Sequence, residues 1–262
     1  MADRGPQLDG RTVLVTGAGS GIGAAAARCL AEAGARVLCT DFDAAAVERV
    51  AATLDAPERH PLPLRLDVAR EEDWAAAALA HPALDGLVHS AGISAASPIE
   101  ETSIEDWRRV LTVNLDGAFL AVRHAFRTMR GATDGGSVVL VASASGLRAA
   151  SGAAAYSASK AAVCMLAKAA AKESRDRGLG LRVNTVCPAG VKTPMWESMP
   201  FFRELVAKTG SVDAAYRELA ASTPGGRFAE PEEIGRAILY LVSSESGFVT
   251  GIDLPLDGGY LL

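Results

Sequence analysis

Short β-branched runs alternate with alanine-rich helical stretches along the whole chain of 262 residues, and this alternation constrains the fold more than any other feature. Runs with the composition of buried strands lie at 12–16, 36–40, 63–67, 84–90, 136–143, 181–187 and 251–257. Helical patterns fill the gaps at 21–33, 43–54, 70–80, 103–130, 155–177 and 230–243. Apolar strands separated by helices predict an α/β fold, a Rossmann-type doubly wound parallel sheet of about seven strands with helices on both faces.

No linker rich in proline, glycine or serine divides the chain, so we expect a single domain spanning residues 1–262. The longest interruption of the alternation, 188–229, follows a strand and has helical pieces of its own. Ligand-binding crevices of α/β proteins form at the carboxyl ends of strands, so we interpret this segment as a substrate lid. Its apolar side chains either contact a substrate or pack the lid onto the body: Met195, Trp196, Met199, Phe201 and Phe202.

Charge and composition exclude several classes of partner. A net charge of −5 argues against nucleic acid or an anionic membrane surface as partner. No apolar run approaches the roughly 20 residues that span a bilayer. The first ten residues lack the apolar segment of a signal peptide, and we therefore expect a cytoplasmic protein.

Cysteine and histidine spacing predicts no metal site. The cysteines show no CxxC or other ligand spacing, and their apolar surroundings favour buried free thiols: Cys29, Cys39, Cys164 and Cys187. The histidines are scattered, without an HExxH pair: His60, His81, His89 and His124.

A glycine-rich turn lies between the first strand and the first helix, in the sequence TGAGSGIG at 16–23. Its glycines allow a tight turn and a close backbone approach, and the helix start that follows offers free N–H groups to a pyrophosphate. Asp41 ends the next strand, where a carboxylate can accept hydrogen bonds from both ribose hydroxyls and would repel a 2′-phosphate. No Arg or Lys stands in 16–23 or in 41–46 to offset that repulsion, so we predict NAD as the cofactor. Asp41 could instead cap the following helix, but Asp43 is better placed to do so.

The stretch AYSASKAAV, 155–163, sets Tyr156 and Lys160 one helical turn apart. Positions i and i+4 of a helix share a face, so the two side chains can reach one point. A lysine beside a tyrosine favours the phenolate and lowers the pKa of the phenol, which would make the pair a proton-transfer device. On this fragment alone, the favoured interpretation is an alanine-rich helix in which the tyrosine packs and the lysine is solvated, so the rest of the chain must decide.

Taken together, these motifs resemble the short-chain dehydrogenase/reductase family over nearly the whole chain. The family's cofactor motif TGxxxGxG matches 16–23, its adenine-contacting aspartate matches Asp67-Val68, and its helix asparagine matches Asn114. Its serine and YxxxK motif match Ser143 and Tyr156–Lys160, at the usual separation of 13 residues (156 − 143).

Two departures from the family pattern affect loops near the predicted cofactor site. The usual NNAG reads HSAG here, so that His89 replaces an asparagine, and we expect a structural role for it. The usual PG reads PAG, so that Ala189 replaces the family glycine and the geometry of that loop is in question.

The resemblance implies a set of cofactor contacts, which are Gly17, Ser20, Gly21, Ile22, Gly23, Asp41, Phe42, Asp67, Val68, Ser90, Ala91, Gly92, Tyr156, Lys160, Val191 and Thr193. It also implies that Tyr156 passes a proton to or from the substrate oxygen, that Lys160 binds the nicotinamide ribose, and that Ser143 orients the substrate. Asn114 would anchor a water relay to Lys160, although an asparagine often only bonds local backbone.

The leading hypothesis is an NAD-dependent dehydrogenase of small-to-medium secondary alcohols that also reduces the ketones. A 3-oxoacyl-thioester (acyl carrier protein) reductase using NADPH shares the fold and the catalytic residues, but Asp41 and the net acidity count against it. A nucleotide-binding scaffold or redox sensor without catalysis is the third hypothesis, since a fold does not prove an activity. The helices at 103–130 and 155–177 resemble those that pair subunits in the family, so we expect a homodimer or homotetramer.

Overall fold

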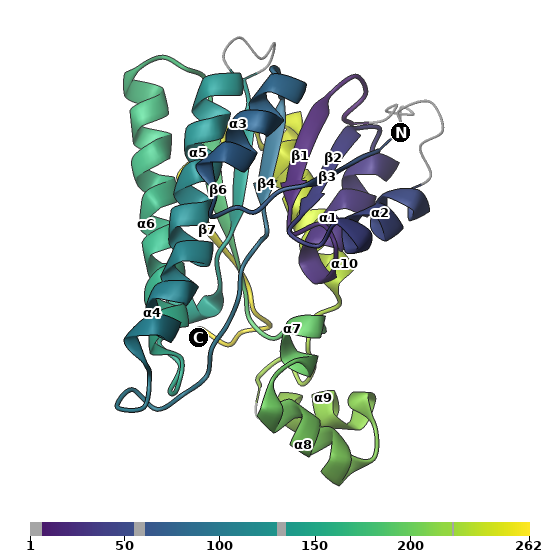
Figure 1. Ribbon diagram of the computed structural model, residues 1–262, viewed down its shortest axis with the longest axis vertical. Helices are drawn as coiled ribbons and strands as arrows, with labels where there is room; N and C mark the ends of the chain where they lie inside the picture. The colour runs from purple at the N-terminus through teal and green to yellow at the C-terminus, as the bar shows by residue number, and fades with distance from the viewer. Residues whose placement is uncertain (1–6, 55–60, 130–134, 222) are drawn as a thin grey trace.

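Seven strands form one sheet in the computed structural model, which describes residues 7–54, 61–129, 135–221 and 223–262 (Figure 1). The strands are β1 (Thr12–Thr16), β2 (Arg36–Asp41), β3 (Leu62–Arg65), β4 (Gly86–His89), β5 (Ser137–Val141), β6 (Arg182–Pro188) and β7 (Asp253–Leu256). They pair in the order β3-β2-β1-β4-β5-β6-β7, and every pairing is parallel. The predicted doubly wound parallel sheet is therefore confirmed.

Two layers of helices cover the two faces of the sheet, as the left and right sides of Figure 1 show. One layer holds α1 (Gly21–Glu32), α2 (Ala44–Thr53) and α10 (Pro231–Val242). The other holds α3 (Glu71–Ala80), α4 (Ile104–Leu111), α5 (Gly117–Thr128) and α6 (Ala154–Asp176). Alternate residues of each strand enter the two separate hydrophobic cores, so that Leu14 and Leu87 pack under α5 and α6 while Val13 and Val88 pack under α1 and α10. Burial on both faces explains why the strands read as continuous apolar runs.

The helical pattern at 103–130 proves to be interrupted. Between α4 and α5 the chain makes a π-helical turn, Thr112–Asp116, which has the predicted site residue Asn114 at its centre. The sequence pattern did not predict this turn, because its residues keep the helical periodicity on both sides. π-helical turns inside helices frequently mark functional sites, since the extra residue aims a side chain inward. Asn114 is accordingly buried.

The segment predicted as a lid forms three short helices after β6: α7 (Pro194–Glu197), α8 (Pro200–Thr209) and α9 (Val212–Ala220). They extend below the carboxyl ends of the strands in Figure 1 and have a small hydrophobic core of their own. The parallel bridge between Val191 and Ala229 joins the two ends of the segment. Among the residues that the structure describes, no helix is long and apolar enough to cross a membrane.

Candidate active site

The glycine-rich turn packs so tightly that a Cβ is excluded at several of its glycine positions. A Cβ on Gly23 would lie 2.0 Å from the carbonyl oxygen of Gly17, and one on Gly17 would lie 2.7 Å from the backbone nitrogen of Ala91. Gly17 and Gly21 also adopt positive φ angles of 66° and 51°, which favour glycine. Ser20 is the N-cap of α1 but makes no capping side-chain hydrogen bond, so the first N–H groups of the helix point out of the turn. This combination suits a pyrophosphate.

Asp41 contacts the glycine-rich turn directly. Its Oδ2 accepts a hydrogen bond from the backbone N–H of Gly19 at 2.9 Å, and its Oδ1 accepts one from Asp43 at 3.0 Å. Asp43 in turn caps α2 by accepting from Ala46, which confirms that the cap is Asp43 and leaves Asp41 at the mouth of the predicted ribose site. A cation that the sequence patterns did not bring forward, Arg65, lies on the neighbouring strand β3.

The guanidinium of Arg65 is engaged away from Asp41. It stacks on the exposed ring of Phe42, with its Cζ 5.3 Å from the ring centroid, and it pairs with Asp73 at 3.2 Å. Asp73 also accepts the backbone N–H of Asp67 at 2.8 Å, which fixes the loop that carries Asp67 and Val68. Phe42 and Asp67 thereby lie at the ends of adjacent strands, where the resemblance places the adenine contacts.

The loop after β4 is held between β1 and the π-helical turn. Ser90 and Ala91 donate their backbone N–H groups to Oγ1 of Thr16, at 3.2 and 3.3 Å. Asn114 exchanges two hydrogen bonds with the backbone of Ile93, accepting its N–H at 2.8 Å and donating to its carbonyl at 2.9 Å. The Asn114 amide also donates to Oγ of Ser159 at 3.0 Å, so it ties this loop to α6.

Ser143 lies just beyond the end of β5 and is the N-cap of a short helical turn at Ala144–Gly146. A Cβ on Gly146 would lie 2.7 Å from the carbonyl carbon of Lys160, which shows how closely this turn approaches α6. The close approach brings the hydroxyl of Ser143 within hydrogen-bonding reach of the Tyr156 phenol. The neighbouring Ser145 instead donates its backbone N–H to Ser143, at 3.1 Å.

Tyr156 and Lys160 share one face of α6, as their spacing predicts, and Lys160 Nζ lies 5.7 Å from the centroid of the tyrosine ring. The lysine is buried and donates to the carbonyl oxygen of Val141 at 2.8 Å. Burial lowers its pKa to about 8, an effect that the thiols of Cys164 and Cys187 oppose. The ammonium therefore titrates near the working range of an enzyme.

The expected lowering of the Tyr156 pKa is not found in the chain without cofactor. Burial raises the pKa of this phenol, and the hydrogen bond with Ser143 opposes that shift only in part. The physical reason is that the Lys160 ammonium is directed to the Val141 carbonyl and not to the phenol oxygen. A tyrosine that acts as a base here needs further positive charge close to its oxygen.

Thr193, predicted to meet the nicotinamide amide, lies beside the glycine-rich turn, because a Cβ on Gly21 would be 3.1 Å from its Cγ2. The lid holds it in place: the hydroxyl of Tyr216, from α9, donates to its carbonyl oxygen at 3.2 Å. Burial and then the carboxylate of Glu197 raise the pKa of Tyr216 to about 12, so the phenol remains protonated. Sequence reasoning missed Tyr216, since no short motif connects two residues that lie 23 apart.

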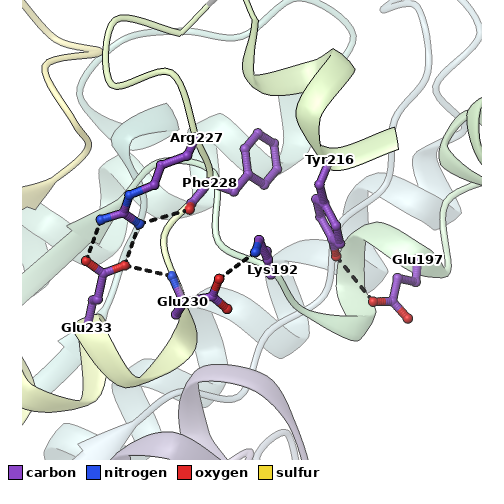
Figure 2. Close-up of polar contacts among 7 residues, drawn as sticks. All are labelled: Lys192, Glu197, Tyr216, Arg227, Phe228, Glu230 and Glu233. Atoms are coloured by element: carbon purple, nitrogen blue, oxygen red, sulfur yellow. Dashed lines mark hydrogen bonds and ion pairs between the residues drawn. The ribbon is translucent and has the colours of Figure 1, made fainter. Parts of the chain in front are cut away.

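The base of the lid is closed by ion pairs and an aromatic ring (Figure 2). Arg227 makes two hydrogen bonds to Glu233, at 2.6 and 2.7 Å, and Lys192 pairs with Glu230. The ring of Phe228 lies against Gly190, where a Cβ would be 2.7 Å away. The departure PAG is thus accommodated, because the glycine that this packing requires is Gly190.

The apolar lid side chains divide into two groups. Phe202 is fully buried in the core of the lid, which identifies it as a packing residue. Trp196 and Met199 are only partly buried against that core, and Phe201 is exposed. The indole of Trp196 meets the ring of Phe228 edge-on at 5.2 Å. These partly covered side chains, with Met195, remain the predicted substrate surface.

All four cysteines are buried free thiols, which confirms the prediction. Folding also brings Cys164 and Cys187 together, with 3.8 Å between their sulfur atoms, near the carboxylate of Asp253. That carboxylate is already paired with Lys168 and accepts a hydrogen bond from Thr185 at 2.7 Å. Cys164, Cys187 and Asp253 therefore form a hydrogen-bonded part of the core, below the predicted catalytic lysine Lys160.

Known proteins resemble this chain along almost its entire length. The family described as "Enoyl-(Acyl carrier protein) reductase" matches residues 17–261. The chain is 36% identical to the 2,5-dichloro-2,5-cyclohexadiene-1,4-diol dehydrogenase LinX of Sphingobium indicum, over 99% of this chain and 98% of that protein. It is 37% identical to the meso-2,3-butanediol dehydrogenase of Serratia marcescens, over 97% and 95% of the two chains. It is 32% identical to the NADP-dependent (R)-specific alcohol dehydrogenase of Lentilactobacillus kefiri, over 99% of each.

A solved structure described as ribose-5-phosphate isomerase from Brucella melitensis 16M has the same fold. It superposes with a TM-score of 0.85 at 31% sequence identity and covers 99% of this chain and 95% of its own. Its described activity differs from that of the dehydrogenase relatives, and a shared fold does not by itself transfer an activity. The family match and the relatives agree with the motifs at the glycine-rich turn, Asn114, Ser143 and Tyr156–Lys160. The chain belongs to the short-chain dehydrogenase/reductase family.

Proposed function

We propose that the protein is an NAD-dependent dehydrogenase of secondary alcohols, which also catalyses the reverse reduction of the ketones. One observation carries the proposal: Asn114, Ser143 and the pair Tyr156–Lys160 come from three separate segments and meet at the carboxyl ends of β4 and β5, beside the glycine-rich turn. Ligand sites of doubly wound sheets form at this edge.

The residues present fit a dinucleotide. The glycine positions 17, 19 and 23 have no room for a Cβ, and the side chain of the N-cap residue Ser20 does not cap α1, which leaves the first N–H groups of the helix to an anion. The other residues that would hold the cofactor are Ile22, Asp41, Phe42, Asp67, Val68, Ser90, Ala91, Gly92, Tyr156, Lys160, Val191 and Thr193. A bound nicotinamide would supply the hydride acceptor for an alcohol and the hydride donor for a ketone.

The proposed preference for NAD over NADP rests on charge at the ribose site. Asp41 holds a carboxylate there, and the nearest cation on the adjoining strand, Arg65, is paired with Asp73. A 2′-phosphate would therefore be repelled by the Asp41 carboxylate, and Arg65, which is paired with Asp73, would not be free to offset that repulsion. The NADP-dependent relative from Lentilactobacillus kefiri shows that both preferences occur among similar proteins, so the choice must be measured.

Tyr156 is the proposed general base in alcohol oxidation and general acid in ketone reduction. Ser143 would donate a hydrogen bond to the substrate oxygen, where negative charge develops in the transition state. Because burial raises the pKa of Tyr156, the proposal requires the oxidised cofactor's positive charge in addition to Lys160 to favour the phenolate. Asn114 would hold the loop and α6 in register and anchor a water relay to Lys160.

We infer a small-to-medium, mainly uncharged substrate, taken from cyclic and acyclic secondary alcohols or diols. The partly covered Met195, Trp196, Met199 and Phe201 offer apolar contacts from the lid. The names of the relatives support the same class, since one acts on a cyclic diol and another on an acyclic diol.

A second candidate is favoured by one specific observation, the description of the matching family as an enoyl-(acyl carrier protein) reductase, since that description points to substrates bound to a carrier protein. The candidate is a 3-oxoacyl-thioester reductase, which acts on the ketone of such a thioester and not on a carbon–carbon double bond, and it would be expected to use NADPH. Comparing turnover with NADH and NADPH separates the two candidates. A strong preference for NADPH, with turnover of acyl thioesters and none of simple alcohols, would replace our first proposal.

The decisive test is Tyr156→Phe assayed on a panel of alcohols and ketones. We expect turnover to fall by at least about a hundredfold, because a general acid–base residue typically contributes that much to the rate. Binding of NADH should remain unchanged. A matched control is Tyr260→Phe, which removes a phenol far along the chain. Wild-type protein that binds NADH but converts no member of the panel would instead favour a non-catalytic scaffold or sensor.

We also propose that the protein forms a homodimer or homotetramer. Phe119 on α5 and Met165 on α6 are exposed large apolar residues on the two helices that the resemblance assigns to subunit contacts. Light scattering at micromolar concentration should report more than one chain per particle, and a monomer would refute the proposal. A cytoplasmic location stays a prediction, to be checked by cell fractionation.

A further inference from the structure

His89, the residue that replaces a family asparagine, is buried at the end of β4 with only 2% of its surface exposed. Its Nδ1 lies 3.0 Å from Oγ1 of Thr16. Its Nε2 is buried and has no hydrogen-bond partner among the described residues. A buried polar atom without a partner destabilises the folded state, so it calls for an explanation.

The hydrogen-bond network assigns the tautomer of His89. Oγ1 of Thr16 accepts the backbone N–H groups of Ser90 and Ala91, and its own hydrogen is then free to be donated to Nδ1 of His89. The proton of the neutral imidazole therefore resides on Nε2. Burial, and secondly the nearby Lys160 ammonium, lower the pKa of His89 to about 3, so the ring is neutral throughout the physiological range. Nε2–H is thus a buried hydrogen-bond donor that has no acceptor among the described residues.

Strand alternation places this donor on the catalytic face of the sheet. Leu87 and His89 point to the same side of β4, and Leu87 belongs to the core under α5 and α6. The loop that begins at Ser90 leads to Gly92, where a Cβ would lie 3.3 Å from both Nζ of Lys160 and Oδ1 of Asn114. The imidazole is therefore beneath the group of residues that includes the predicted catalytic lysine.

We propose that Nε2–H of His89 holds a buried water molecule that also accepts a hydrogen bond from Lys160, which makes His89 a positioning residue for the catalytic ammonium. The inference rests on the proposed function and deepens it. Buried waters typically have about three polar partners, and this one would have an imidazole N–H and an ammonium as donors. Its own hydrogens would be donated to backbone carbonyls around the π-helical turn.

The water would matter to Lys160 because an acceptor stabilises the charged form of an amine. Without it the ammonium loses a partner, its pKa falls, and it supports the phenolate of Tyr156 less well. The buried titratable side chains on the elements packed over this face are Lys160, Cys164, His124 and Cys187, with Tyr156 half-buried and Asp116 exposed. Of these, Lys160 is the one that shifts the pKa of His89.

Two variants test the roles of Nδ1 and Nε2 of His89 separately. In His89→Asn the side-chain amide occupies the place of Nδ1 and keeps the contact with Thr16, whereas in His89→Gln the amide nitrogen reaches the place of Nε2. We expect His89→Gln to keep the pH profile of kcat for alcohol oxidation. We expect His89→Asn to move its rising limb upward by roughly 0.5–1 pH unit, the equivalent of one hydrogen bond of ordinary strength, and to lower kcat about threefold to tenfold below that limb. His124→Asn, which removes another buried imidazole, is the control and should leave the profile unchanged.

A profile of His89→Asn equal to that of the wild type, or an equal shift in both variants, would overturn the proposal. The melting temperature and the NADH binding of each variant show whether it has folded correctly. Two readouts do not require turnover: a high-resolution crystal structure should show a water between Nε2 of His89 and Nζ of Lys160, and NMR titration should show a lower Lys160 pKa in His89→Asn. If the wild type converts no alcohol or ketone, the proposed function fails while these two readouts still decide the role of His89.

Discussion

The carboxylate of Asp41 accepts a hydrogen bond from the backbone N–H of Gly19 at 2.9 Å, so the residue predicted to select the cofactor also holds the turn predicted to bind it. This double role determines which substitution can test the selectivity. Removal of the whole side chain would disturb the turn and the charge together, whereas an asparagine retains an oxygen that can accept from Gly19.

Asp41→Asn is expected to shift cofactor preference towards NADPH. Loss of the negative charge removes repulsion of a 2′-phosphate, and the ratio of kcat/KM for NADPH to that for NADH should rise about tenfold, equivalent to roughly 1.4 kcal/mol. Asp43→Asn, which alters the cap of α2, is the control and should leave the ratio unchanged. A wild-type enzyme that already prefers NADPH would contradict the assignment of Asp41.

Gly23→Ala is expected to abolish dinucleotide binding. The new Cβ would lie 2.0 Å from the carbonyl oxygen of Gly17, so the turn would have to open, at a cost to folding of about 1–3 kcal/mol. Gly10→Ala gives a comparison, because Gly10 has a positive φ of 74° but no atom within 4 Å of its Cβ position. It should lower stability through backbone strain and leave NADH fluorescence titrations unaltered; equal loss of binding in both variants would argue against the turn as the site.

Asn114→Ala is expected to lower both stability and turnover. It removes hydrogen bonds to Ile93 and Ser159 in a buried site, and each unsatisfied partner costs about 1–3 kcal/mol. Chemical denaturation and steady-state kinetics measure the two effects. Asp116→Asn, in the same π-helical turn but exposed, should change neither. Normal kinetics in Asn114→Ala would remove this residue from the proposed site.

Acid should destabilise the fold through buried neutral histidines. Burial, and secondly Arg127, lower the pKa of His124 from 6.5 to about 4, so the unfolded chain binds the extra proton first as the pH falls. The stability that this residue contributes is fully present above pH 6.5 and is lost as the pH falls towards 4. At about pH 5 the loss from this residue alone is roughly 2 kcal/mol.

Denaturant titrations of the wild type and His124→Asn at neutral and acidic pH measure this effect. The variant should be less stable at neutral pH but should lose less stability on acidification. His81→Asn is the comparison, since His81 is partly exposed and should contribute a smaller change. An identical pH dependence in the wild type and His124→Asn would show that His124 is not buried as described.

Two substitutions at the base of the lid should differ sharply in how much they lower the stability of the protein. Phe228→Ala empties a buried ring position against Trp196 and Tyr216 and should cost about 3 kcal/mol, with a higher KM for bulky alcohols. Arg227→Ala breaks an exposed ion pair with Glu233 and should lower the midpoint of thermal denaturation far less than Phe228→Ala does. Thermal denaturation with substrate titrations measures both. A larger effect of Arg227→Ala would mean that the ion pairs, and not the aromatic ring, hold the lid.

Much of the fold could be predicted because its signals are local. Runs such as 12–16 and 137–141 are mostly apolar and almost wholly buried, since a parallel strand under two helix layers has no solvated face. The glycines at 17, 21 and 23 mark the predicted phosphate turn for an equally local reason: a Cβ at 17 or 23 would clash with backbone, and Gly17 and Gly21 have positive φ angles. The spacing of Tyr156 and Lys160 likewise follows from helix geometry alone.

The sequence by itself thus determined the order of the elements, the parallel sheet and the identity of the predicted site residues. Tertiary structure decided how those residues behave: burial raises the pKa of Tyr156 where local spacing had suggested a lower value, and a π-helical turn points Asn114 inward. It also brought Tyr216 to Thr193, and set the unpartnered nitrogen of His89 beneath the catalytic face. The reason is physical: propensity and periodicity are properties of neighbouring residues, whereas desolvation and hydrogen bonding depend on segments that meet only when the chain is packed.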